Sequence, residues 1–166
     1  MSNQSAIRSR TESPFRREEW DLLVKLPGRV VVAATSAEPD TARRTVAEGL
    51  AGIDAIAAGR ASASRLVREV VTAVYAESDD DEPAAEEFHD RTRGIADVLA
   101  ACRMANRLLV ERAGRAEADA YGNWLAAIAT RVCHASRTGG LLGVGGQTVT
   151  LAERRFLADL AAAFDR

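Results

Sequence analysis

The strongest constraint on the fold is a spacing of three and four residues between apolar side chains, which recurs along almost the whole chain. This spacing places apolar side chains on one face of an α-helix, whereas a half-buried strand would show strict alternation. The expected helices cover residues 16–26, 27–36, 41–59, 64–75, 83–113, 115–137 and 150–164. The sequence therefore predicts an all-α protein, a single compact bundle of six or seven helices.

Pro27 and the valines that follow it make one segment ambiguous. Proline has a fixed φ and no N–H, so Pro27 is expected to end a first helix at Leu26 and to open a second, short helix. The three valines at positions 30–32 favour a strand by propensity. The rest of the sequence offers no second strand to pair with them. Residues 29–35 are therefore expected to form a buried helix rather than a strand.

Length, charge and the N-terminal residues indicate one cytoplasmic domain. The chain has 166 residues, enough to bury a single core. Residues 1–14 are polar and basic and are expected to form a disordered tail, which leaves 15–166 as one helical domain. No stretch resembles a secretion signal, and the longest strongly apolar run, residues 30–34, is too short to span a bilayer. The 22 basic and 24 acidic residues disfavour nucleic-acid binding through bulk positive charge.

The apolar stripe of each expected helix is predicted to face the core. In the helix over residues 41–59 this stripe consists of Val46, Leu50, Ile53 and Ala57. Asp54 lies close to it and is expected to be exposed, or paired with an arginine, rather than to act as a buried functional acid. Four aromatic residues lie on apolar stripes and are expected to pack in the core rather than to stack on a ligand: Trp20, Tyr75, Tyr121 and Trp124.

Five glycines lie within the segment GGLLGVGG, residues 139–146. Clustered glycines indicate a backbone that adopts positive φ or approaches another group closely. The following Thr150-Leu-Ala-Glu153 fits a capping box. The preferred interpretation is a structural loop between two helices. The alternative is an anion site, because backbone amides and a helix N-terminus attract negative charge. That site would consist of Gly143, Gly145, Gly146 and Thr150.

The residues best suited to catalysis or metal binding do not form a recognisable site. Glu86 and His89 make one E-x-x-H motif, whereas a di-iron bundle needs two. Cys133 and His134 are adjacent, so on a helix their side chains point about 100° apart and cannot form a nucleophile–base pair. Together with Cys102, these residues also lack zinc-site spacing. We expect buried free thiols, no metal, no cofactor and no enzymatic activity.

The C-terminal part of the chain resembles an uncharacterised family of small, all-helical bacterial proteins. The motif that carries the resemblance is GG-[FL]-LG-x-GG-x-x-V-[ST]-x-x-E, present here as GGLLGVGGQTVTLAE over residues 139–153. The segment from Trp20 to Leu26-Pro27-Gly28 is similar as well. The Val149-Thr-x-x-Glu153 helix start also resembles helix starts in the tellurite-resistance TerB domain, but glycines replace the acidic loop residues of that domain. The resemblance implies an all-helical fold and supplies no catalytic or metal-binding residues.

These observations predict a non-enzymatic cytoplasmic protein, a helical interaction or stress-associated module with an unidentified protein partner. The alternative function is binding of a small ligand or anion by the loop 139–146 and the helix N-terminus that follows it.

Overall fold

The computed structural model describes residues 14–37, 42–77, 90–135 and 149–165. All regular secondary structure in these ranges is helical, which confirms the expected all-α fold. The elements are α1 (Arg17–Ser36), α2 (Ala42–Ala58), the 3₁₀ turn η1 (Gly59–Ala61), α3 (Arg65–Glu77), α4 (Arg91–Arg112), α5 (Arg115–Ala135) and α6 (Leu151–Phe164). Residues 1–13 of the expected tail and the loop 139–146 lie outside the described residues.

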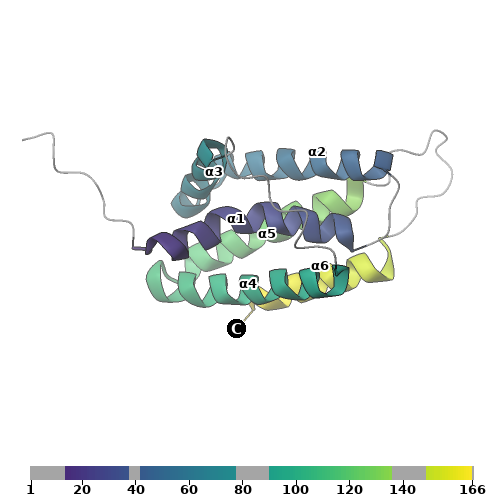
Figure 1. Cartoon of the computed structure of the whole chain (residues 1–166). Coiled ribbons are helices and arrows are strands. Elements are labelled where there is room, and N and C mark those ends of the chain that lie inside the picture. The colour runs from purple at the N-terminus through teal and green to yellow at the C-terminus, as the bar shows by residue number, and fades with distance from the viewer. Residues whose placement is uncertain (1–13, 38–41, 78–89, 136–148, 166) are drawn as a thin grey trace, which may run out of the picture.

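Helices α1 and α5 form the middle of the bundle, and the other helices cover them on two sides (Figure 1). On one side α2 packs against both central helices, and α3 joins it at one end. On the other side α4 and α6 pack against each other, with α4 also on α1 and α6 on α5. Among the described side chains, the fully buried leucines, isoleucines and valines come from every α-helix except α2: Leu23, Leu26, Val30, Val67, Val70, Val71, Val98, Leu109, Leu125, Ile128, Val132 and Leu160.

Helix α1 continues through Pro27, so the expected break at Leu26 is wrong. A proline inside a helix removes the N–H that would bond the carbonyl four residues earlier, here that of Leu23. Tyr121 of α5 supplies the missing donor, because its hydroxyl donates to the Leu23 carbonyl oxygen over 2.7 Å. Tyr121 and Leu23 are both 0% exposed, and an unpaired carbonyl at such a place is costly. The distant tyrosine therefore stabilises one long helix where two short ones were expected.

The valine-rich segment 29–35 is helical throughout, as expected. Val30 is fully buried, and Val31 packs partly buried against the core. A Cβ at Gly52 of α2 would lie 2.6 Å from a γ-carbon of Val31. Glycine at position 52 therefore lets α2 lie close against α1.

Helix α2 packs through a face that combines two small residues with a glutamate and an isoleucine, and the stripe expected to face the core lies on the opposite side. The inward positions are Glu48, Gly52, Ala55 and Ile56. The outward positions include Val46, Leu50 and Ile53, which are 63%, 60% and 54% exposed. Both faces have helical spacing, and the inward face is buried because Gly52 and Ala55 permit close contact with the neighbouring helices. The expectation that Val46, Leu50 and Ile53 belong to the core is therefore wrong.

Helix α4 is one uninterrupted helix, and Gly94 is buried inside it. It begins later than the expected start at Pro83, because the Asp90 side chain accepts a hydrogen bond from the Arg93 N–H over 3.1 Å and caps the helix there. Residues 83–89 lie outside the described part of the chain. Gly114 ends α4 as expected, with a φ of 91° that favours glycine at this position.

Helix α6 packs through Phe156 and Leu160, both buried as expected. The sequence places Leu151 on the same apolar stripe, but the residue is 78% exposed at the first position of the helix. The contact of α6 with α5 is close at Gly122, where a Cβ would lie 2.5 Å from the γ-carbon of Phe164. Glycine thus mediates close helix packing here, as it does between α1 and α2.

Candidate functional site

Thr150 belongs to the expected anion site and lies at the start of α6, whereas Gly143, Gly145 and Gly146 lie outside the described residues. The Thr150 hydroxyl accepts from the Glu153 N–H over 3.2 Å, and the Glu153 carboxylate accepts from the Thr150 N–H over 2.8 Å. These reciprocal bonds confirm the capping box. They satisfy two backbone amides at the end of the helix that an anion would approach.

The charge of Glu153 works against an anion at the start of α6. This residue is only 3% exposed, so its carboxylate already lies, shielded from water, at the positive end of the helix. An anion at the same place would compete with this carboxylate for the positive end of the helix. Thr150, the one described residue of the expected site, therefore serves as a structural helix cap.

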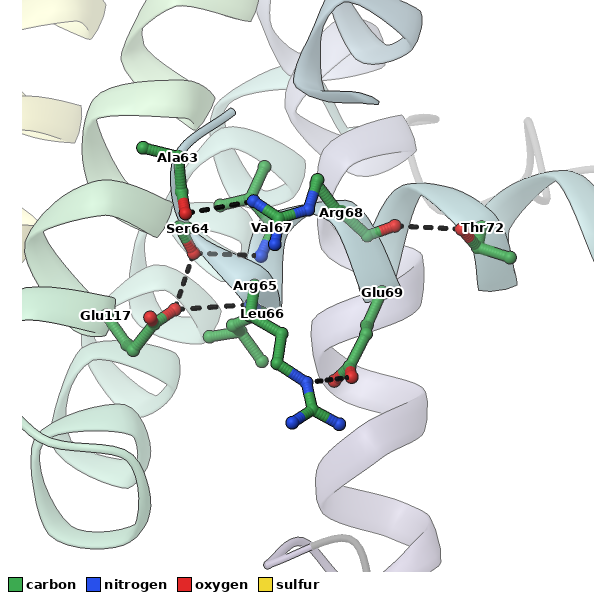
Figure 2. Close-up of polar contacts among 9 residues, drawn as sticks. All are labelled: Ala63, Ser64, Arg65, Leu66, Val67, Arg68, Glu69, Thr72 and Glu117. Carbon is green, nitrogen blue, oxygen red and sulfur yellow. Dashed lines mark hydrogen bonds and ion pairs between the residues drawn. The ribbon is translucent and has the colours of Figure 1, made fainter. Parts of the chain in front are cut away.

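A serine hydroxyl and a glutamate carboxylate meet where the start of α3 lies beside α5 (Figure 2). The Ser64 hydroxyl donates to Glu117 Oε2 over 2.5 Å, and the Leu66 N–H donates to the same oxygen over 3.3 Å. The Ser64 hydroxyl also accepts from the Val67 N–H over 3.0 Å. The sequence predicts that Ser62 or Ser64 caps α3, and the structure shows Ser64 in that role. Nothing in the local sequence points to Glu117, which is 53 residues away.

This pair contains the atoms of a nucleophile and a base, but its geometry is that of a structural contact between helices. An activated serine gives its proton to a base and keeps its oxygen accessible for attack. The Ser64 oxygen is engaged by an α3 amide, and the residue is 8% exposed. The nearby Arg68 donates to the carbonyl oxygens of Ser62 and Ala63 over 2.5 and 2.9 Å. These contacts join α3 to α5 and hold the turn before α3 in place (Figure 2).

Cys102 and Cys133 are free thiols, 0% and 1% exposed, as expected. Burial raises the pKa of Cys102 to about 12, so this thiol stays protonated and unreactive at neutral pH. His134 is exposed, and its Nδ1 lies 2.8 Å from the carbonyl oxygen of Thr130 in its own helix. Among the described residues no group of three or more His, Cys, Asp or Glu could hold a metal ion. The motif at residues 86–89 lies outside them.

The remaining candidate is the row of residues on the solvent side of α2, Val46, Leu50, Ile53 and Ala57, which we call the outer stripe. Its three large side chains are 54–63% exposed, and Ala57 is partly buried. Asp54 is exposed beside the stripe, as expected, and is the only exposed charged residue at positions 46–58. Contiguous apolar surface of this kind marks contact sites. The outer stripe therefore has the composition of an interface.

Tyr75 of α3 extends this apolar surface, since it is 39% exposed rather than buried as expected. Its hydroxyl donates to the Ile53 carbonyl oxygen over 3.4 Å, and the Arg60 guanidinium lies 4.3 Å from the centre of its ring. These contacts hold the aromatic ring beside the C-terminal half of the outer stripe. The other aromatic residues singled out in the sequence lie in the core or against it, as expected: Trp20, Tyr121 and Trp124.

No family model matches the chain, and neither a curated protein nor a solved structure matches it significantly. Within the described ranges, no helix is both long enough and apolar enough to cross a membrane.

Proposed function

We propose that this protein is a non-enzymatic, stress-associated interaction module of the cytoplasm, and that it binds a partner helix on the outer stripe of α2. The observation that carries the proposal is the exposure of Val46, Leu50 and Ile53 on a helix whose opposite face makes the core contacts. The polar contacts at Ser64–Glu117 and Thr150–Glu153 serve to cap and join helices. Covering apolar surface contributes about 25 cal/mol per Å². A partner that covers this stripe therefore stabilises the complex relative to the separate proteins.

The chemistry of the stripe favours an amphipathic helix as the partner. Its four positions are separated by four, three and four residues, which is the spacing of a coiled-coil seam. The flanking residues Ala47, Gly49 and Ala51 are small and uncharged, so a second helix can approach closely. Between positions 46 and 58 the exposed charge on this helix is the carboxylate of Asp54, which would repel a polyanion such as a nucleic acid. The guanidinium of Arg60 lies beyond this range, over the ring of Tyr75.

Binding of the neutral dye Nile red to the monomer tests whether the outer stripe is an accessible apolar surface. Leu50→Glu should reduce the dye fluorescence and change the free energy of unfolding by no more than about 0.5 kcal/mol, because the side chain lies outside the core. Met104→Glu is the matched control, since Met104 is 53% exposed on α4 and its change should leave the α2 contribution intact. Undiminished dye binding by Leu50→Glu, or its marked destabilisation, would contradict the proposal.

The second candidate function is binding of a small ligand or anion by the loop 139–146 and the start of α6. Its support is the capped helix start at Thr150 after the glycine cluster, and the buried carboxylate of Glu153 weakens it. Thermal melts with added inorganic phosphate test this candidate. A rise of the melting temperature that is lost in Gly145→Val would favour the anion site. An equal response of the two proteins would refute it.

A further inference from the structure

The outer stripe ends beside an arginine whose guanidinium lies over an aromatic ring. Arg60 comes three residues after Ala57, in the 3₁₀ turn η1 that follows α2. It is exposed, and its guanidinium lies 4.3 Å from the centre of the Tyr75 ring. The Tyr75 hydroxyl in turn donates to the carbonyl oxygen of Ile53, a residue of the outer stripe. The apolar stripe and this cation are therefore parts of one surface.

Arg60 differs from the arginines of the neighbouring helix α3, which are engaged by oxygen atoms of this chain. Arg65 forms an ion pair of 2.7 Å with Glu69, and Arg68 donates to two backbone carbonyl oxygens of the turn before α3 (Figure 2). Within the described part of the chain, no oxygen accepts a hydrogen bond from Arg60, and its contact is with the face of Tyr75. A guanidinium stacked on a ring keeps its N–H edge open to a carboxylate.

We propose that the partner of the outer stripe is an acidic amphipathic helix, with a carboxylate at the end of its apolar face that binds Arg60. This inference rests on the proposed docking function of the stripe. Tyrosine and arginine are enriched among the residues that contribute most to protein interfaces, and the guanidinium fork matches a carboxylate in a bidentate pair. The sequence places a second arginine, Arg43, three residues before Val46. A partner with carboxylates beyond both ends of its apolar face therefore complements this surface.

Asp54 determines where the acidic residues of the partner can lie. It follows Ile53 directly, so the two side chains point about 100° apart on the helix. Arg60 comes six residues after Asp54, which is at least about 9 Å along the axis at 1.5 Å per residue. The Debye length at physiological ionic strength is about 8 Å, so a carboxylate in contact with Arg60 is attracted by it more strongly than it is repelled by Asp54. The middle of the partner's face is therefore apolar and its ends are acidic.

Two other occupants fit this surface less well. A second copy of α2 would place arginine against arginine in either direction, Arg43 against Arg60 when antiparallel and each against its own counterpart when parallel. A bilayer of anionic lipids would attract Arg60 but repel Asp54, which is exposed beside the stripe. An acidic helix avoids both conflicts.

Two synthetic peptides test the charge of the partner by fluorescence anisotropy. Each carries a fluorophore and a helical face of leucines, with a glutamate beyond each end of this face in the acidic peptide and a lysine at the same places in the basic peptide. The full chain should bind the acidic peptide about two- to fivefold more tightly, the range that an exposed ion pair supplies. Leu50→Glu should weaken the binding of both peptides, because both cover the outer stripe.

Charge reversal at Arg60 tests the contact itself. Arg60→Glu should weaken the acidic peptide by about two- to fivefold and strengthen the basic one. Arg107→Glu is the matched control, since it changes the net charge equally at an exposed position of α4, on the other side of the central helices, and should leave the preference intact. Arg60→Gln removes the charge without reversing it and should give an intermediate preference, so the result does not depend on one variant.

Equal affinities of the two peptides, or equal effects of Arg60→Glu and Arg107→Glu, would overturn the acidic partner. If Leu50→Glu still weakens both peptides in that case, the docking function stands without it. If neither peptide binds, the acidic partner is wrong, and the Nile red measurement decides the docking function separately. Dimerisation of the chain in sedimentation, or binding to phosphatidylglycerol vesicles, without peptide binding would assign the stripe to one of the other occupants instead.

Discussion

The hydrogen bond between Tyr121 and the Leu23 carbonyl predicts a specific energetic coupling to Pro27. In the native chain the tyrosine hydroxyl is the donor that compensates for the missing N–H of Pro27, at 2.7 Å and with Tyr121 and Leu23 fully buried. Tyr121→Phe removes the hydroxyl and leaves a buried carbonyl without this donor, at a cost of about 1–3 kcal/mol. In a Pro27→Ala background the alanine N–H donates to the same carbonyl within the helix. In that background the carbonyl keeps a donor when the tyrosine hydroxyl is removed. The substitution then costs only the net contribution of one hydrogen bond, about 0.5–1.5 kcal/mol.

The double-mutant cycle therefore predicts that Tyr121→Phe lowers the free energy of unfolding by about 1 kcal/mol less in the Pro27→Ala background than in the parent. Urea denaturation of the parent, the two single variants and the double variant measures this coupling. In a thermal melt the same energy corresponds to a shift of about 2–4 °C for a domain of this size. Equal costs of Tyr121→Phe in both backgrounds would refute the reasoning, because the hydroxyl would then not be substituting for the proline.

Three further predictions concern stability. Thr150→Ala should lower the free energy of unfolding by about 0.5–2 kcal/mol through loss of the α6 cap, and an unchanged urea midpoint would show that the cap is unimportant. Gly122→Ala should cost about 1–3 kcal/mol, because its Cβ overlaps the side chain of Phe164, whereas Gly28→Ala, where a Cβ meets nothing within 4 Å, should be neutral or stabilising. Denaturation midpoints compare the two variants, and equal effects would contradict the role of close packing at Gly122. Finally, stability should fall as the pH rises from 9 towards 12, because burial raises the pKa of Cys102 from 9.0 to about 12 and the unfolded chain loses this proton first. Cys102→Ala should flatten the fall, and an equally steep fall in that variant would rule out this thiol as its source.

The helix ends were the most predictable part of the fold because their determinants are local. Thr150 and Glu153 are three residues apart, and each satisfies a backbone amide of the other. Gly114 ends α4 in the left-handed conformation that glycine adopts most readily. Such features depend on a few neighbouring residues, so the sequence shows them directly.

Pro27 and Glu117 show where local reasoning stops. Proline is expected to end a helix when only the local sequence is considered. Here the hydroxyl of Tyr121, on another helix, donates to the Leu23 carbonyl, and the helix continues. The expected cap of α3 was correct at Ser64, whereas the carboxylate that completes it comes from 53 residues away. Both cases depend on contacts between helices that are distant in sequence. Such contacts cannot be inferred from the spacing of residues along the chain.

Helix α2 shows why apolar spacing alone can choose the wrong face. Large apolar side chains normally indicate the core side, but Gly52 and Gly59 allow closer approach to neighbouring helices on the opposite face. A Cβ at Gly59 would lie 2.7 Å from the Trp124 indole nitrogen. The stripe expected in the core thus became the candidate docking surface, while the site expected at Gly143, Gly145 and Gly146 stays a prediction.

The central claim, that the outer face of α2 is a contact surface and its inner face is core, is tested most directly by two isoleucines on this one helix. Ile53 is 54% exposed and Ile56 is 7% exposed. In dilute protein, Ile56→Ala should lower the free energy of unfolding by about 2–5 kcal/mol. Ile53→Ala should change it by no more than about 0.5 kcal/mol. Equal costs, or a larger cost for Ile53→Ala, would place the outer stripe in the core of the chain and contradict the account.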